Sequence, residues 1–364
     1  MRKRGLTTLL SGCILLSCLT ACGGGGGSSS QGSASLPEEP SVSVIAPIPD
    51  PEPVVYPYTN PLTGEGCDVD IGKNRPIAVM LNNLKKAMPQ VGVSQADVIY
   101  EMVAEGGITR MMALFQDVEG AGEIGTVRSA RDYYVSLACG HDAIFLHAGG
   151  SPQAYISIRD WGVTALDCVN GPYEGTLFWR DQTRRKNAGL EHSVLTSSEK
   201  IQELLPTYSR VEPEHEEGFT VGWTFSEEAP AGGQAASQVT VPFSSYKTGV
   251  FTYDPETNQY LVSQYDAPYV DGNTGEQVAV SNVLVLHTDI SAVRGDDAGR
   301  QSVRTTGSGE GVLLRDGQIY SITWQRDDRS DCLSFLDQSG QPIPLAVGHS
   351  YINIVGQSAD VTWA

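Results

Sequence analysis

The chain has 364 residues, of which 40% are hydrophobic and 18% charged, and this is enough to bury one large core or two ordinary ones. Forty glycines and twenty prolines disfavour a helical bundle. The 43 acidic and 24 basic residues give a formal net charge of −19. Because this charge repels phosphate backbones, a general nucleic-acid-binding protein is disfavoured, and only a local basic cluster could bind a polyanion.

The first 22 residues have the pattern of a bacterial lipoprotein signal. Basic residues at positions 2–4 precede an apolar stretch at 6–19, and the segment ends in Leu-Thr-Ala followed by Cys22. This ending matches a lipobox, so we predict that the signal peptide at 1–21 is removed and that Cys22 is lipidated. An ordinary secretory signal, cut just before Cys22, is the alternative.

Residues 22–59 are predicted to form a tether. Glycines and serines follow the anchor cysteine, and a proline-rich spacer occupies residues 36–58. Acyl chains on Cys22 would hold the protein to a membrane. No later segment reaches the roughly 20 apolar residues that a spanning helix needs. We therefore expect a lipid-anchored body at the outer face of the cytoplasmic membrane.

Residues 60–209 carry the signals of a mixed α/β domain. Apolar runs predict strands at residues 76–81, 98–104, 108–115, 124–127 and 143–147. Capping patterns predict helices at 133–139 after Ser129, at 152–161 after Ser151, and after a capping box at 196–199. The strands at 124–127 and 143–147 alternate with helices, so they are predicted to be parallel neighbours.

Residues 210–364 are predicted to form a β-rich, mostly antiparallel domain. Short apolar runs are separated there by turn dipeptides, namely Asp254-Pro255, Asp271-Gly272, Asp316-Gly317 and Ser339-Gly340. Residues 226–238 have the composition of an exposed loop. The chain is therefore expected to consist of an α/β domain followed by a β domain.

The motifs of the body, taken in order, resemble the YerB-like lipoprotein family of Firmicutes. They are NPLTG at 60–64, RPIAVMLNN at 75–83, GTVRSARDYYV at 125–135, DAIFLHAGGSPQAY at 142–155 and FWRD at 178–181. The resemblance implies a two-part domain of unknown function behind a lipoprotein signal, with no established reaction. This chain has Thr126 where the family pattern has proline.

An anion-binding crevice is predicted where the strands at 124–127 and 143–147 end. Each strand leads into a helix N-terminus, whose free N–H groups and positive dipole end favour anions. The candidate anion-binding residues are Arg128, Arg131, His147, Ser129 and Ser151, with Arg110 and Arg180 as further candidates because a guanidinium binds phosphate or carboxylate bidentately. The alternative is that these arginines pair with the carboxylates of Asp132, Glu101, Glu105 or Asp181 and hold loops in place.

Other kinds of site have little support in the sequence. The chain has no HExxH, CxxC or Gly-x-Ser-x-Gly pattern, and no metal or cofactor is predicted. His141 and Asp142 are interpreted as a surface helix end. The segment from Asp271 begins like a calcium loop, but Asn282 stands where the bidentate glutamate should be, so a hairpin turn is preferred.

Two classes of function remain. The favoured one is an extracytoplasmic lipoprotein that binds an envelope protein or an anionic envelope ligand. The alternative is an envelope enzyme that acts on a phosphorylated substrate, such as one linked to a lipid pyrophosphate. This alternative is based on a short similarity between residues 125–135 and the arginine-containing segment of LytR-CpsA-Psr cell-wall phosphotransferases. The arginines of those enzymes hold a lipid pyrophosphate. The sequence does not decide whether the protein is an enzyme.

Overall fold

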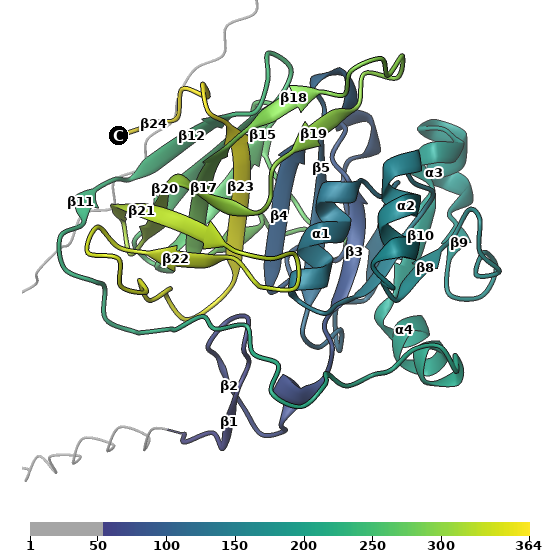
Figure 1. The fold of residues 1–364 in the computed structure, drawn as a ribbon, viewed down its shortest axis with the longest axis horizontal. Helices are drawn as coiled ribbons and strands as arrows, with labels where there is room; N and C mark the ends of the chain where they lie inside the picture. The colour runs from purple at the N-terminus through teal and green to yellow at the C-terminus, as the bar shows by residue number, and fades with distance from the viewer. Residues whose placement is uncertain (1–53) are drawn as a thin grey trace, which may run out of the picture. The chain divides into compact units, whose positions relative to one another are not determined.

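A computed structural model describes residues 54–364 of the chain (Figure 1). The expected signal peptide, the lipidated Cys22 and the tether through residue 53 lie outside the described residues. Tyr58–Thr59 (β1), which we expected at the end of the tether, pairs antiparallel with Gly66–Cys67 (β2). Among the described residues, no helix has the length and apolarity needed to cross a bilayer.

The largest sheet has eleven strands and contains strands from both halves of the chain. The first half contributes β3 (Ile77–Asn82), β4 (Val98–Val103), β5 (Thr109–Phe115), β7 (Ile144–His147) and β8 (Ala165–Asp167). The second half contributes β11 (Gln234–Ala235), β17 (Asn282–Thr288), β20 (Gly307–Arg315), β21 (Gln318–Arg326), β22 (Ser334–Leu336) and β23 (Ser350–Gly356). One sheet therefore runs through both expected domains.

The two halves of this sheet meet at β4 and β23. The strand order is β11-β21-β20-β17-β23-β4-β5-β3-β7-β8, with β22 beside β21. β4 and β23 are parallel, with Val98 opposite Ser350. Parallel pairs also join β17 to β23, β3 to β7 and β7 to β8, whereas the remaining neighbours are antiparallel.

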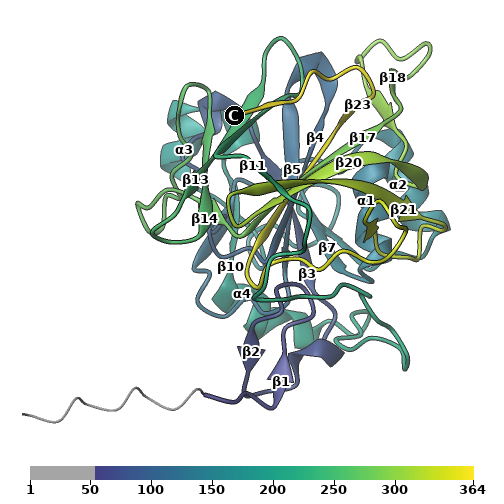
Figure 2. The same cartoon turned by 90° about the vertical axis from the view of Figure 1, so that its left-hand side faces the viewer.

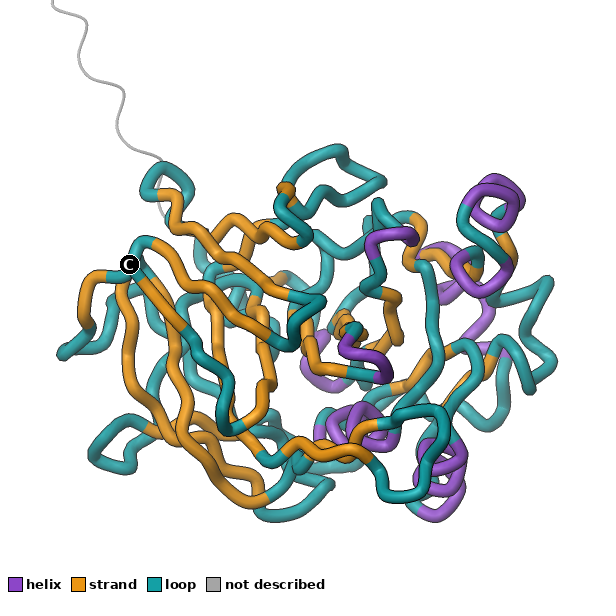
Figure 3. The backbone as a smooth tube through the Cα atoms, turned by 90° about the horizontal axis from the view of Figure 1, so that it is seen from above, coloured by secondary structure: helices purple, strands orange, loops and turns teal. Residues whose placement is uncertain are grey.

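The smaller sheets and the helices complete the body. An antiparallel sheet holds β12 (Gln238–Pro242), β13 (Thr248–Asp254), β14 (Gln259–Gln264), β15 (Ala267–Pro268), β16 (Ala279–Val280) and β24 (Thr362–Trp363). β6 (Glu123–Gly125), β9 (Trp179–Arg180) and β10 (Val194–Ser197) form a second, and β18 (Ile290–Ala292) with β19 (Gln301–Val303) a third. The α-helices are α1 (Asp132–Gly140), α2 (Pro152–Asp160), α3 (Gln182–Asn187) and α4 (Ser198–Leu204). They gather at one end of the body (Figure 3), which confirms a mixed α/β first half and a β-rich, mostly antiparallel second half.

The central strands are covered on both faces. Successive side chains of a strand point to opposite faces, so alternate residues of β3 enter two different apolar clusters. Val79 and Leu81 pack in the cluster that contains β12, β13 and β14, whereas Met80 packs in the cluster that contains α1. Figure 2 shows α1 and α2 on one side and β13 and β14 on the other. Burial on both faces explains why β3 is a continuous apolar run.

The prediction that residues 124–127 and 143–147 form neighbouring parallel strands is wrong. β6 pairs antiparallel with β10, with Gly125 opposite Leu195. β7 instead lies between β3 and β8, parallel to both. Because β7 occupies the edge of β3 from Ile77 to Val79, the segment after β6 reaches β3 only through one bridge between Val127 and Leu81.

The capping predictions had mixed outcomes. Ser151 caps α2 as expected, because its hydroxyl accepts from the N–H of Ala154 at 3.0 Å. Ser129 does not cap α1, since the helix begins at Asp132 and has Arg131 in the N-cap position, with no side-chain cap. At α4 the capping hydroxyl belongs to Ser197, one residue after the expected position.

The end of α1 is buried against the second half of the chain, so the interpretation of His141 as a surface residue is wrong. Its imidazole Nε2 lies 2.8 Å from the hydroxyl of Tyr100. The thiol of Cys332 donates to the carbonyl of Gly140 at 2.9 Å, and the Trp223 ring packs against the imidazole in a T-shaped arrangement. His141 therefore joins α1 to segments that are distant in sequence.

We expect His141 to make the protein less stable in acid. Burial, together with the charge of Arg326, lowers the pKa of His141 to about 3, whereas an unfolded histidine titrates near 6.5. A lowered folded pKa means that its contribution is complete above pH 6.5 and is lost as the pH falls from 6.5 towards 3. When the pH is lowered from 7 to 5, the free energy of unfolding measured with urea should fall by roughly 2 kcal/mol more in wild type than in His141→Gln. Equal losses in both proteins would contradict this assignment.

Candidate arginine site at the sheet edge

The carboxyl ends of β3, β4, β7 and β8 lie at one edge of the central sheet, because β5 is antiparallel to both β3 and β4. Ligands of open α/β sheets bind beyond this edge. The strands end there at Asn82, Val103, His147 and Asp167, and β5 begins beside them with Thr109 and Arg110. The N-termini of α1 and α2 follow from the same edge.

Three arginines, here called the arginine cluster, meet at this edge: Arg110, Arg128 and Arg131. Arg110 pairs across the sheet with Asn82 on one side and Met102 on the other. The backbone N–H of Arg128 donates to the carbonyl of Met80 at 2.8 Å, which holds the loop before α1 against β3. The Arg131 guanidinium donates to the carbonyl of Ala130 at 2.6 Å.

Two carboxylates pair with the cluster: Glu105, which the alternative interpretation of the arginines named, and Glu191, which it did not. The Glu105 carboxylate accepts from Nε of Arg131 and lies 3.4 Å from Nη2 of Arg110. The Glu191 carboxylate lies 3.1 Å from Nη2 of Arg128. The Nε atoms of Arg110 and Arg128 are nevertheless buried without a hydrogen-bond partner in the described part of the chain. The cluster thus has more guanidinium donors than acceptors.

The cluster carries excess positive charge, because three guanidinium groups face two carboxylates. The Arg110 side chain is only 5% exposed, and burial together with the charges of Arg131 and Arg128 lowers its pKa to about 10. Burial on its own would raise the pKa of Glu105, but the hydrogen bond from Arg131 and the charges of Arg131 and Arg110 hold it at about 2. Glu105 is therefore ionised at neutral pH and still leaves a positive imbalance around Arg110.

Two cavities flank the loops that carry the cluster. The first, which we call the basic cavity, has a volume of about 740 Å³ and is lined by charged residues Lys86, Arg128, Arg180 and Glu191. The second, the hairpin cavity, has a volume of about 550 Å³ and lies between the helix N-termini and the β18–β19 hairpin, with charged residues Arg131, Asp132, Arg294 and Arg300. Residues 128–131 and 149–151 form the wall between them, joined by a bridge from Ala130 to Gly150.

The expected single crevice is therefore divided. Arg128, Ser129 and Arg180 line the basic cavity, whereas Arg131 and Ser151 line the hairpin cavity. His147 and Arg110 line neither of them. The division arises because residues 128–131 run alongside 149–151 and so place their side chains on both sides of this pair of loops.

His147 is a buried side chain beneath the cluster. Its imidazole stacks on Phe145, and Nδ1 lies 2.8 Å from the carbonyl of Gly149. Burial lowers the pKa of His147, and the nearby charge of Asp167 only partly opposes this effect. The imidazole is therefore neutral at pH 7 and orders the 147–150 loop.

The other candidates also have partners within the protein. The Ser129 hydroxyl donates to the carbonyl of Ala148 at 3.1 Å. Arg180 lies across the basic cavity, where its Nε donates to the Glu174 carboxylate at 2.9 Å and its Nη1 donates to the carbonyl of Leu190 at 2.9 Å. Ser129 and Arg180 thus fix the shape of the basic cavity.

Sequence reasoning missed Lys86, Glu191, Tyr155 and Asp167 at this edge. Asp167 ends a strand, and its carboxylate accepts from the N–H of Gly149 and from the hydroxyl of Tyr155, both at 2.7 Å. The lysine pair after β3 and the acidic end of β8 were visible signals. No local signal placed Glu191 beside Arg128, since 63 residues separate them.

Within residues 54–364 no group of three histidine, cysteine or acidic side chains could hold a metal ion. The Asp271 segment forms a turn, as preferred from the sequence. The buried Asp271 carboxylate accepts from the N–H groups of Gly92 and Ser94, at 3.2 and 2.8 Å, and so attaches this turn to the segment before β4.

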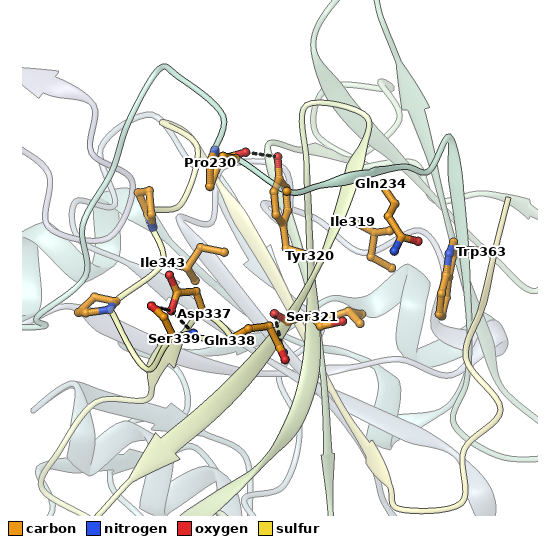
Figure 4. A pocket seen from close by; sticks show the side chains of 15 residues that line it. Pro230, Gln234, Ile319, Tyr320, Ser321, Asp337, Gln338, Ser339, Ile343 and Trp363 are labelled. Atoms are coloured by element: carbon orange, nitrogen blue, oxygen red, sulfur yellow. Dashed lines mark hydrogen bonds between the residues drawn. The ribbon is translucent and has the colours of Figure 1, made fainter.

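A further cavity of about 660 Å³ lies in the second half of the chain, over β21 (Figure 4). Tyr320 and Trp363 line it, but its polar groups are engaged locally. The Tyr320 hydroxyl donates to the carbonyl of Pro230 at 3.0 Å, and the Asp337 carboxylate accepts from Ser339. This cavity has none of the cationic residues that mark the sheet edge.

Comparisons with known proteins agree with the resemblance seen in the sequence. Models for the N-terminal and C-terminal domains of "Protein of unknown function (DUF3048)" match residues 62–210 and 239–352. "Putative lipoprotein YerB" of Bacillus subtilis is 31% identical over 297 residues, which are 81% of this chain and 85% of that protein. The crystal structure of YerB from Bacillus subtilis matches with a TM-score of 0.72 and 26% identity, over 84% of this chain and 99% of that one.

Proposed function

From the premise that this chain belongs to the DUF3048 family of YerB-like lipoproteins, whose function is unknown, we propose that it is a membrane-anchored extracytoplasmic protein that binds an anionic envelope ligand. The single observation that carries this proposal is the arginine cluster with its two buried, unpartnered Nε atoms. The anchor is the lipid expected on Cys22. The ligand would bind at the basic cavity, beside Arg128.

An anion would relieve two unfavourable features of the cluster. A buried donor without an acceptor costs about 1–3 kcal/mol, and a phosphate or carboxylate oxygen in the basic cavity would supply an acceptor to Arg128, the member of the cluster that lines it. A bound anion would also offset the mutual repulsion that lowers the pKa of Arg110. Because the protein as a whole is acidic, this local positive charge favours a small anionic group over a large polyanion.

The alternative is an envelope enzyme that acts on a phosphorylated substrate. One observation favours it: Tyr155 lines the basic cavity, and its hydroxyl donates to the Asp167 carboxylate at 2.7 Å. Burial, together with that carboxylate, raises the pKa of Tyr155 to about 12, so a phenolate nucleophile is scarce at neutral pH. We therefore favour binding over catalysis.

Arg128→Ala should weaken anion binding about ten- to a hundredfold. Loss of one charge-assisted contact costs on the order of 1.5–3 kcal/mol, which corresponds to this range in affinity. Arg128→Lys should recover only part of it, because an ammonium keeps the charge but not the planar fork. Calorimetric titration with inorganic pyrophosphate, on the mature chain carrying Cys22→Ser, measures the effect.

The matched control is Arg159→Ala. Arg159 lies in the last turn of α2, and its side chain is 72% exposed and paired with Asp160. The Arg159→Ala variant should bind pyrophosphate as wild type does. The proposal fails if wild type does not bind pyrophosphate, or if Arg128→Ala and Arg159→Ala bind it equally well.

A further inference from the structure

The basic cavity combines its cations with exposed apolar side chains. Val169 and Leu190 both line it, and each is 52% exposed. Most large apolar side chains among the described residues are buried, so two half-exposed ones at a single cavity are notable. The remaining apolar lining consists of Val127, Ala148, Ala188 and Val194.

Both exposed side chains belong to backbone segments that hydrogen bonds hold at the basic cavity. Leu190 directly precedes Glu191, which pairs with Arg128, and its carbonyl accepts from Arg180 at 2.9 Å. The N–H of Val169 donates to the Asp167 carboxylate at 2.8 Å, which fixes the turn after β8. Both backbones are therefore held, and the apolar side chains have defined places beside the guanidinium groups.

Val169 also lies next to the loop that carries the arginine cluster. A Cβ atom built on Gly149 would come within 3.5 Å of the Ser129 hydroxyl and 3.7 Å of Cγ2 of Val169. The glycine has φ of +77°, a conformation that side chains rarely adopt. Glycine is therefore favoured here by its backbone conformation and not by lack of space, and Val169 and the arginine loop both lie within contact distance of this position.

We propose that the ligand of the basic cavity is an anionic amphiphile, with a phosphate-like group bound by Arg128, Lys86 and Arg180 and an apolar chain packed over Val169 and Leu190. This inference rests on the proposed function and names the chemistry of its ligand. The positive charges of the cavity favour an acidic group, and its half-exposed apolar side chains favour an apolar ligand tail. A cavity of about 740 Å³ has the size of an ordinary small-molecule site.

Alkyl phosphates of two lengths test the proposal. Decyl phosphate, below its micelle concentration, and methyl phosphate carry the same acidic group and differ only in the chain. Calorimetric titration of the mature chain with Cys22→Ser, without detergent, should give at least tenfold tighter binding of decyl phosphate. The ratio of the two affinities should fall towards one in the double variant Val169→Thr/Leu190→Ser. Thermal melts should first show that each variant is folded.

The matched control is Val69→Thr. Val69 is 67% exposed and lies before the 3₁₀-helix Ile71–Lys73, away from the basic cavity, so its variant should keep the wild-type ratio. The inference is overturned if wild type binds both phosphates equally, or if the control lowers the ratio as much as the double variant does. Binding of methyl phosphate that depends on Arg128, without a gain from the chain, would overturn this inference and leave the proposed function standing.

Discussion

Replacing Lys247 by methionine should lower the free energy of unfolding by about 3–5 kcal/mol, because it leaves a buried carboxylate without its counter-charge. Nζ of Lys247 lies 3.0 Å from the Glu101 carboxylate, and both side chains are 1% exposed. The ammonium also lies over the rings of Phe243 and Tyr265, at 5.4 and 5.6 Å. This pair connects the β12–β13 turn to β4, at the edge that carries the arginine cluster.

The remaining partners of Glu101 explain why Lys247→Met should not be rescued locally. The carboxylate accepts from Asn83, Thr109 and Tyr351, at 2.7, 2.6 and 2.5 Å. Hydrogen bonds stabilise the ionised form but cannot neutralise its charge in a buried place. Burial of the Glu101 carboxylate therefore destabilises the folded state once the ammonium is gone.

A double variant separates loss of the ion pair from loss of packing. In Glu101→Gln/Lys247→Met neither charge of the pair remains buried, so we expect this protein to be more stable than Lys247→Met alone. Urea unfolding followed by circular dichroism measures all three proteins. If Lys247→Met were as stable as wild type, or if the double variant were no more stable than Lys247→Met, the pair would not be a buried salt bridge in solution.

Arg110→Met should weaken pyrophosphate binding by about tenfold or more through loss of its charge, although Arg110 lines neither cavity, and should leave the free protein as stable as wild type or more so. Arg110 is the most buried member of the cluster, and a low-dielectric environment strengthens its attraction for a nearby anion. In the absence of an anion, burial and two neighbouring arginines disfavour its charge. Its removal should stabilise the free protein by on the order of 1 kcal/mol.

Opposite effects on stability and on binding are characteristic of a side chain kept for its ligand. Thermal unfolding with and without pyrophosphate measures both quantities in one experiment. Arg315→Met is a useful comparison, since Arg315 is equally buried but donates to Asp316 and to the carbonyls of Pro344 and Ser226. That variant should be destabilised. The functional assignment would be refuted if Arg110→Met were destabilised as much as Arg315→Met and bound pyrophosphate as wild type does.

Local signals in the sequence were sufficient for most elements of the fold. The apolar runs at 76–81, 98–104 and 108–115 became β3, β4 and β5, and the serine and proline before 153 became the start of α2. These predictions succeed because burial of a strand and capping of a helix depend on residues that are adjacent in the chain. The order of motifs likewise identified the family.

The candidate site was predicted in its composition but not in its arrangement. Arg128 and Arg131 do lie at the carboxyl edge of the parallel strands, close enough to Arg110 to affect its pKa. Their placement in two cavities did not follow from the sequence. It depends on the pairing of residues 128–131 with 149–151, which a capping pattern read along the chain could not reveal.

The sequence by itself determined the membership of the family, the succession of strands and helices, and which arginines follow strand ends, because each depends on neighbouring residues. Only the tertiary structure decided that β6 pairs with β10, that Val98 of β4 lies opposite Ser350 of β23, and that Glu105 and Glu191 are the partners of the cluster. Those pairings depend on which sheet edges are free and on what packs beside them. Both conditions are set by segments far away in the chain, so no short pattern carries them.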